Sequence, residues 1–267
     1  MTRFDEGDRN VVRIYTLLIL AAEPLAEKKI ADEVPMNELN ELLQELNTMV
    51  NAQFETPEIR HFFAVPMTME RARFYTVHNA LYTANRRDCW GHVQGAAPMD
   101  VKALVWQHES DELINDPRCN TDHFTLSVKQ GEVLGLTPKD FDVEPPPMIR
   151  ACFHAWLHIA KMSPWLVAFT SSQMLERRNN GEIVRGGGMS FRVGQKLERE
   201  LGIQPKKMVS VDVHSTADTE HSNMMEAVYK RYATTPLARE AVLQGARESM
   251  AIDRAFRGSM AYLMERI

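Results

Sequence analysis

Cysteine is scarce in this 267-residue chain, and its scarcity excludes two kinds of structure. The three cysteines, Cys89, Cys119 and Cys152, are odd in number, widely spaced and without a C-x-x-C pair. A disulfide-stapled fold needs paired cysteines, and a thiolate zinc site needs closely spaced ones. We therefore expect a protein of the reducing cytoplasm that has neither.

A strong excess of charge of one sign is also missing. Lysine and arginine together number 31 and aspartate and glutamate 36, which gives a net charge of -5. Nucleic-acid-binding proteins usually carry a basic patch or stripe, so nucleic acid is excluded as an expected partner. Hydrophobic residues at 44% and charged residues at 25% are ordinary values for a soluble globular protein.

Long hydrophobic runs are absent as well. The most apolar early stretch, residues 11–22 (VVRIYTLLILAA), is short and contains Arg13, whereas a membrane-spanning helix needs roughly 20 apolar residues. A secretory signal begins with basic residues, but Asp5, Glu6 and Asp8 precede this stretch. We interpret it as a buried amphipathic helix of a cytoplasmic protein and expect no membrane partner.

What the sequence does contain is a succession of helical patterns. Residues 36–50 place leucines at steps of three and four, which is typical of a one-sided helix. Similar patterns continue as far as a terminal helix over 236–267, and the one hint of a strand lies near Ile183. These patterns predict an all-α protein, with residues 1–267 forming a single helical-bundle domain.

Three boundary signals support this helical prediction. Asp122 is placed to cap a helix that starts at residue 123. Gly202 is placed to end the short helix that precedes Gly202 in the chain. Ser163 and Pro164 interrupt the longest helical run, residues 148–180, which should be kinked or divided there.

Residues 211–228 (VDVHSTADTEHSNMMEAV) carry the most informative motif. His214, Asp218 and His221 recur at steps of four and three, so they share one helix face, and Met225 continues that face toward the core. Buried ionisable groups are costly unless they are paired or bound to metal. Imidazole and carboxylate are ligands that divalent iron or manganese prefers. The motif therefore indicates a metal-binding helix; the alternatives are a hydrogen-bonded polar cluster and a solvated face.

A metal site in a bundle core needs ligands from facing helices. Four other predicted helices each carry one histidine or glutamate on an apolar stripe: His78, Glu112, His123 and Glu176. His108 lies one turn before Glu112 and is a candidate supporting or substitute ligand. Each residue alone is more often a satisfied core polar group, but together they favour the metal hypothesis.

The order of these residues resembles that of the heme-oxygenase-like diiron oxidases and oxygenases. The fold of that superfamily is shared with thiaminase-type and PQQ-synthase-type proteins. In this resemblance, residues 214–221 (HSTADTEH) match the His-x-x-x-Asp-x-x-His helix, Glu112 and His123 match a Glu-then-His pair, and Glu176 matches a later glutamate. The resemblance covers residues 67–230, which would be the metal-site core of a heme-oxygenase-like bundle.

One position departs from the pattern. Where members such as the undecene-forming fatty-acid decarboxylase carry a glutamate on the first core helix, this sequence carries His78. An imidazole can hold one metal ion but cannot bridge two as a carboxylate can, so one metal ion and two metal ions both stay open. The resemblance implies seven metal ligands: Glu112, His123, Glu176, His214, Asp218, His221 and His78.

The resemblance further implies an O2-dependent non-heme iron oxidoreductase. Iron(II), as one or two ions, would be the cofactor, with manganese as a substitute and O2 as co-substrate. The reaction would be N-oxygenation, hydroxylation, desaturation or oxidative C–C cleavage of a small organic substrate in a natural-product pathway. An external electron donor and a homodimer are both compatible with the family. The alternative is a metal-independent member of the same fold: a cofactor-free oxidase, a thiaminase-like hydrolase or a small-ligand-binding protein.

Overall fold

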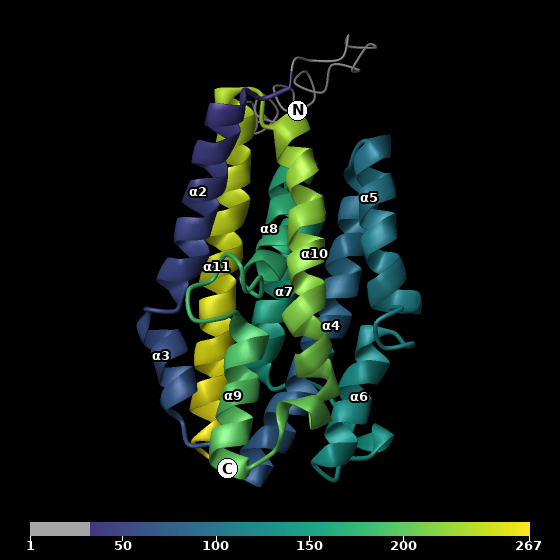
Figure 1. The fold of residues 1–267 in the computed structure, drawn as a ribbon, viewed down its shortest axis with the longest axis vertical. Coiled ribbons are helices and arrows are strands. Elements are labelled where there is room, and N and C mark those ends of the chain that lie inside the picture. Colours follow the sequence, from purple (N-terminus) through teal and green to yellow (C-terminus); the bar gives the residue numbers. More distant parts are fainter. Residues whose placement is uncertain (1–32) are drawn as a thin grey trace, which may run out of the picture. The chain divides into compact units, whose positions relative to one another are not determined.

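Helices dominate the part of the chain that the computed structural model describes, residues 33–267 (Figure 1). They are α2 (Met36–Gln53), α3 (Pro57–Ala64), α4 (Met69–Ala96), α5 (Met99–Glu109), α6 (His123–Val133), α7 (Pro147–Met162), α8 (Trp165–Arg177), α9 (Met189–Leu201), α10 (Val209–Tyr232) and α11 (Pro236–Met264). Within these residues the only strand-like feature is a bridge between Asp116 and Thr121. The all-α prediction is therefore confirmed, and the hint of a strand near Ile183 is wrong because that segment forms turns.

The predicted helix over residues 11–22 lies outside the described residues. The described residues, Glu33–Ile267, form one compact unit. A single domain spanning 1–267 stays a prediction.

Local sequence signals set several of the helix ends. The Asp122 carboxylate accepts a hydrogen bond from the Thr125 N–H at 2.8 Å, which confirms it as the cap of α6. Gly202 ends α9 with a φ of 69°, a left-handed conformation that favours glycine. The chain breaks at Ser163 and Pro164, which separate α7 from α8 and confirm the predicted division.

Helix α8 lies at the centre of the bundle. It contacts α2, α4, α7, α10 and α11, and its residues from Leu166 to Arg177 are all buried. Its polar side chains must therefore find partners inside the protein. The Tyr229 hydroxyl of α10, for example, donates to Gln173 at 3.0 Å. At its crossing with α11, Gly245 brings the two backbones together, since a Cβ there would lie 2.4 Å from the Val167 carbonyl oxygen.

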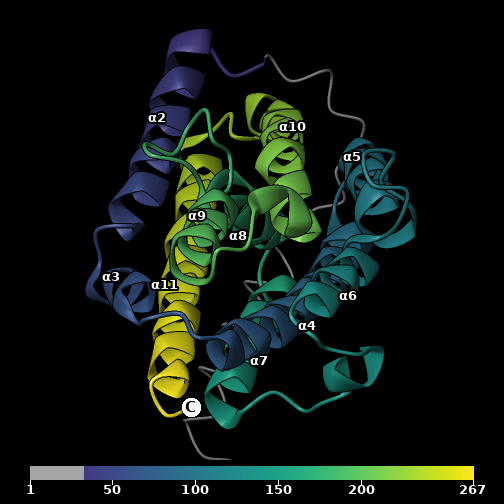
Figure 2. The same ribbon diagram turned by 60° about the horizontal axis from the view of Figure 1, so that its bottom comes forward.

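The remaining helices are arranged around α8 and α11 (Figure 2). Helices α2 and α3 pack against α11, whereas α5 and α6 pack against α4. Helix α10 contacts α5, α6, α8 and α9. Ligand candidates carried by α5, α6, α8 and α10 are thus on neighbouring helices.

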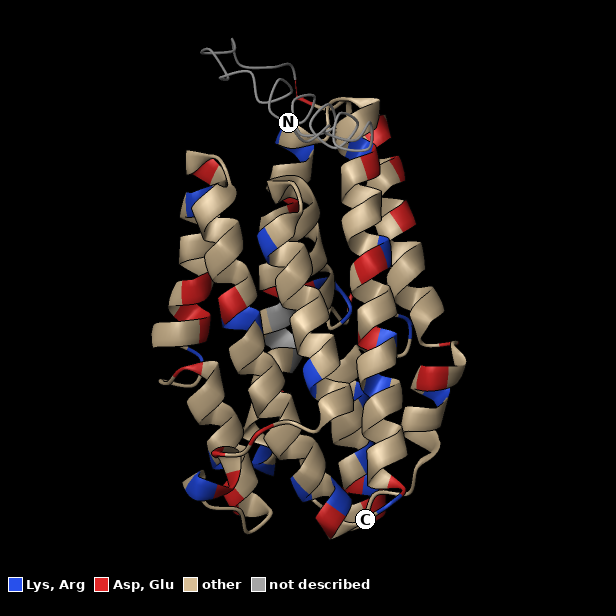
Figure 3. Cartoon of the chain, turned by 180° about the vertical axis from the view of Figure 1, so that it is seen from behind, with Lys and Arg blue, Asp and Glu red and all other residues tan. Residues whose placement is uncertain are grey.

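Charged positions of both signs are interspersed along the described helices (Figure 3). This unit is therefore not divided into one basic region and one acidic region. Between residues 33 and 267, every helix is too short or too polar to cross a membrane.

Candidate metal centre

Histidine and glutamate side chains from neighbouring helices converge in the bundle core. Their ligand atoms form two groups, and within each group these atoms lie within 4.8 Å of one another. The first group is His108, Glu112, Glu176 and His221, and the second is Glu112, His123 and His214.

Glu112 belongs to both groups. Its Oε1 lies 3.0 Å from Nδ1 of His123 and 3.4 Å from Nδ1 of His221. A carboxylate placed between two sets of ligands is suited to bridge two metal ions. Glu112 lies between the two sets of ligand atoms.

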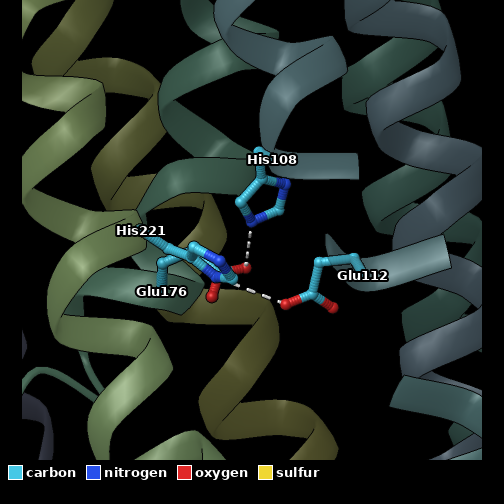
Figure 4. A group of neighbouring side chains, drawn as sticks. All are labelled: His108, Glu112, Glu176 and His221. Carbon is cyan, nitrogen blue, oxygen red and sulfur yellow. Dashed lines mark ion pairs between the residues drawn. The ribbon is translucent and has the colours of Figure 1, made fainter. Parts of the chain in front are cut away.

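The four side chains of the first group converge from neighbouring helices (Figure 4). His108 points at Glu176, with Nε2 3.6 Å from Oε1, and the His221 ring faces Glu112. All four residues are at most 5% exposed. Ionisable groups buried so closely need either charge pairing or a metal ion.

A π-turn sets the position of Glu112 relative to His108, which ends α5. After α5 the chain continues as η1 (Ser110–Ile114), where the Asn115 N–H donates to the Ser110 carbonyl five residues earlier at 2.9 Å. Such wide turns inside helices occur frequently at functional sites. Apolar periodicity along the sequence does not distinguish this wider turn from a regular helix.

The other nitrogen of each imidazole is held by a nearby oxygen. Nδ1 of His108 lies 2.9 Å from Glu109, Nε2 of His123 2.9 Å from Asp116, Nδ1 of His214 2.6 Å from the Ser210 carbonyl, and Nε2 of His221 3.5 Å from Asp111. Metal-binding histidines typically donate their second N–H to a carboxylate or carbonyl, which fixes the ring orientation. The four histidines follow this pattern.

Three of the nitrogens that face the carboxylates lie 3.0–3.6 Å from a carboxylate oxygen but make no well-aligned hydrogen bond. They are Nε2 of His108, Nδ1 of His123 and Nδ1 of His221, and all are buried. Buried polar atoms nearly always have a partner, so these exceptions need an explanation. A divalent iron or manganese ion provides one, because imidazole nitrogen and carboxylate oxygen are ligands that it prefers. The residues present therefore fit a metal ion.

Two arginines of α4 pair with the glutamates. Nη2 of Arg86 lies 2.7 Å from Oε1 of Glu176, and Nη1 of Arg87 lies 2.8 Å from Oε2 of Glu112. The pairs offset part of the cost of burying the two carboxylates. The sequence offers no signal for them, because the partners lie 90 and 25 residues apart.

These charges control the protonation of the glutamates. Burial opposes ionisation of Glu112, but the charges of His123 and Arg87 hold its pKa well below the usual range. Burial likewise opposes ionisation of Glu176, and the Arg86 guanidinium outweighs it and lowers the pKa of that carboxyl. Both side chains are therefore carboxylates, the form that binds metal.

The histidines differ in their protonation. Burial lowers the pKa of His214 to about 4. Burial also opposes the charged forms of His108 and His123, but neighbouring carboxylates outweigh it and raise the pKa of each to about 9. His214 can therefore bind a metal ion as it stands near neutral pH, whereas His108 and His123 must first release a proton.

The structure brings together five of the seven predicted ligands: Glu112, His123, Glu176, His214 and His221. The side chain of Asp218 lies outside the described part of the structure. His108 joins them, and its place one turn before Glu112 is the sequence signal that marks it.

His78 is in neither of the two groups. It is buried on α4 with its ring against Phe74, the ring centroids lying 4.2 Å apart. Burial lowers the pKa of His78 to about 4. Its role as a metal ligand stays a prediction.

Two adjoining cavities border the centre. The first is lined by Glu112, Glu176 and Arg86, among others. The second extends toward α9 and α11, and both are lined by Tyr82 and His214. A small molecule held in the second cavity would therefore lie next to the ligand groups.

Comparisons with solved structures show the fold. A domain of unknown function with a heme oxygenase-like fold from Shewanella denitrificans OS217 has a TM-score of 0.68 and 15% identity, covering 85% of this chain and 93% of that one. A CADD-like protein of unknown function from Nostoc punctiforme PCC 73102 has a TM-score of 0.66 and 15% identity, with coverages of 85% and 98%. A TenA homologue from P. horikoshii OT3 has a TM-score of 0.55 and 16% identity, with coverages of 83% and 98%. The predicted heme-oxygenase-like fold is thus confirmed.

No curated protein matches this chain. The sequence profile of a family described as "Iron-containing redox enzyme" matches residues 73–254, which include every member of the two ligand groups. The chain therefore belongs to this family of iron-containing redox enzymes.

Proposed function

We propose that this chain is a non-heme iron oxidoreductase that uses O2 to oxidise a small organic substrate. The observation that carries the proposal is the pair of ligand groups sharing Glu112, in which buried imidazole nitrogens face carboxylates without a well-aligned hydrogen bond. Membership of a family of iron-containing redox enzymes supports iron as the metal.

The two groups correspond to two metal positions. Glu112 would serve both positions, with His108, Glu176 and His221 completing the first and His123 and His214 the second. Asp218 is a further proposed ligand on the spacing of its motif. Bound iron(II) would supply a redox centre and Lewis acid with open positions for O2.

The surrounding residues prepare the site for this chemistry. Arg86 and Arg87 hold the carboxylates of Glu176 and Glu112 in place through short charge-assisted hydrogen bonds. His214 presents a neutral ring at the border between the two cavities. His108, Glu112, Glu176 and His221 are each at most 5% exposed, which limits the contact of the first group with water.

The reaction we propose is N-oxygenation, hydroxylation, desaturation or oxidative C–C cleavage, in a natural-product pathway. Reduction of O2 to water consumes four electrons, and hydroxylation or desaturation of a substrate supplies two. An external electron donor would then supply the other two. A reducing, cytoplasmic location is supported by the three cysteines, which are all unpaired.

Iron binding tests the proposal. Metal-free protein loaded anaerobically with iron(II) should retain about one to two irons per chain by elemental analysis, and O2 should then produce a transient absorbance change. His214→Ala and His108→Gln should lower the iron content, and His92→Ala, on α4 outside the two groups, should not. His78→Gln decides whether His78 is also a ligand.

A metal-independent member of the same fold is the second candidate, because Arg86 and Arg87 already compensate the glutamate charges. In that case chelators would leave activity unchanged. Absence of iron binding, together with wild-type behaviour of His214→Ala, would overturn the iron proposal in favour of this candidate.

A further inference from the structure

Two buried arginines line the cavity next to the metal centre. Arg178, at the C-terminal end of α8, is 2% exposed, and Arg257, on α11, is 1% exposed. Neither belongs to the ligand groups, and neither is used in the function proposed above. Burying a guanidinium is costly, so its partners must be accounted for.

Asp253 is the only carboxylate that pairs with either arginine in the described structure. Its oxygens lie 3.2 Å from Nε of Arg178 and 3.6 Å from Nε of Arg257. All four atoms are buried, and none of them makes a well-aligned hydrogen bond. The shared carboxylate thus attracts both arginines but satisfies neither.

The other contacts of the two guanidiniums are with neutral groups. Nη2 of Arg178 donates to the Tyr82 hydroxyl at 3.1 Å, and Nη1 of Arg257 lies 3.5 Å from Oδ1 of Asn79. Two guanidiniums against one carboxylate leave one positive charge at the cavity wall. An anion in the cavity would balance this charge and accept hydrogen bonds from the planar guanidinium groups.

The position of this charge links it to the metal centre. Tyr82, Thr83, Asn179 and His214 line both cavities. Because His214 is also a member of the second ligand group, an anion held by the arginines would place the rest of its molecule beside that group.

We propose that Arg178 and Arg257 bind the carboxylate of a small organic acid, and that this acid is the substrate of the enzyme. The second part rests on the proposed iron function. One excess positive charge matches a monoanionic carboxylate better than a phosphate, which carries up to two negative charges near neutral pH.

Small carboxylates test the proposal on metal-free protein. Acetate and propanoate are titrated against their amides and against inorganic phosphate at constant ionic strength, with binding followed by NMR. The acids should bind about tenfold or more tightly than acetamide and propanamide, because hydrogen bonds between charged partners are stronger than those to a neutral amide. This comparison within the wild type needs no variant and so does not depend on how well a variant folds.

Arginine variants locate the binding. Arg178→Gln and Arg257→Gln should each lower the acetate affinity about tenfold, and Arg254→Gln, a matched change on α11 outside this cavity, should leave it unchanged. Thermal unfolding of each variant confirms that it is folded. Equal binding of acid and amide, preference for phosphate, or unchanged acetate affinity in the folded Arg178 and Arg257 variants would overturn the proposal. Because these titrations contain no metal, their failure is distinct from a failure to bind iron.

Discussion

The chemistry of single residues in the metal centre depends on what holds each imidazole. His123 lies between the carboxylates of Glu112 and Asp116, at 3.0 and 2.9 Å. His214 instead donates to a backbone carbonyl and keeps a neutral ring. Two residues of the same type in one ligand group therefore start from opposite protonation states.

This difference predicts how the stability of the metal-free protein depends on pH. The folded-state pKa of His108 and His123 is raised from 6.5 to about 9, so between these values the folded chain binds protons that the unfolded chain has released. Each histidine contributes on the order of 1–3 kcal/mol to the free energy of unfolding. This contribution is fully present below pH 6.5 and is lost as pH rises through 9. Urea unfolding at pH 6.5 and pH 9 should show this loss.

His108→Gln should remove about half of the decrease in unfolding free energy between pH 6.5 and pH 9. The pKa of His78 and of His214 is lowered to about 4, so their contribution is present above 6.5 and is lost as pH falls toward 4. The metal-free protein should therefore be most stable near pH 6.5. A free energy of unfolding that rises from pH 6.5 to 9 would contradict the assignment.

At the scale of elements, the position of Glu176 depends on how closely α8 approaches α11. Gly245 permits this approach, because an added Cβ would meet the Val167 carbonyl oxygen at 2.4 Å and the Ser171 nitrogen at 3.2 Å. These are backbone atoms, which cannot move aside as a side chain can. A larger residue would have to push the two helices apart.

Gly245→Ala should therefore destabilise the protein by about 1–3 kcal/mol through overpacking. Gly91→Ala, inside α4 with nothing within 4 Å of its Cβ, should instead stabilise it by about 0.5–1 kcal/mol through helix propensity. Chemical denaturation of both variants measures the contrast. Equal effects of the two substitutions would show that the crossing tolerates a methyl group.

At the scale of the whole molecule, the ligand groups connect α5, η1, α6, α8 and α10. A metal ion bound by side chains from several of these helices favours the folded state, because the unfolded chain cannot present the ligands together. Metal affinity and global stability should therefore change together.

Iron(II) added anaerobically should raise the melting temperature. At a free concentration 100-fold above the dissociation constant, the added stability should be about 2.7 kcal/mol. His221→Ala should lose most of this increase, while its metal-free melting temperature serves as the reference. If iron(II) raised the melting temperature of wild type and His221→Ala equally, the metal would bind at a site that does not include His221.

The sequence predicts those parts of the site that depend on spacing within one helix. His214 and His221 share a face because seven residues make two helical turns, and Asp122 caps α6 because a short acid precedes an apolar run. The all-α fold follows from the same periodicity. Such features are local, so they can be read without knowing how the helices pack.

Choosing between His78 and His108 requires the packing itself. Both lie on apolar stripes of predicted helices, and both are buried in the structure. The packing of the helices separates them, because His108 lies 3.6 Å from Oε1 of Glu176 whereas His78 packs against Phe74. The pairing of Arg86 and Arg178 with distant acids likewise depends on tertiary contacts that no local pattern records.

The place of α11 in the chain has a consequence for biosynthesis. Helix α11, Pro236–Met264, is translated after α8, yet it covers α8 along the crossing at Gly245 and also packs against α2, α3 and α7. Since proteins emerge from the ribosome N-terminus first, α8 cannot reach its buried state on a nascent chain that still lacks α11. Every ligand residue, of which His221 is the last, has by then been made. Metal binding in the fully packed core would therefore follow synthesis of α11.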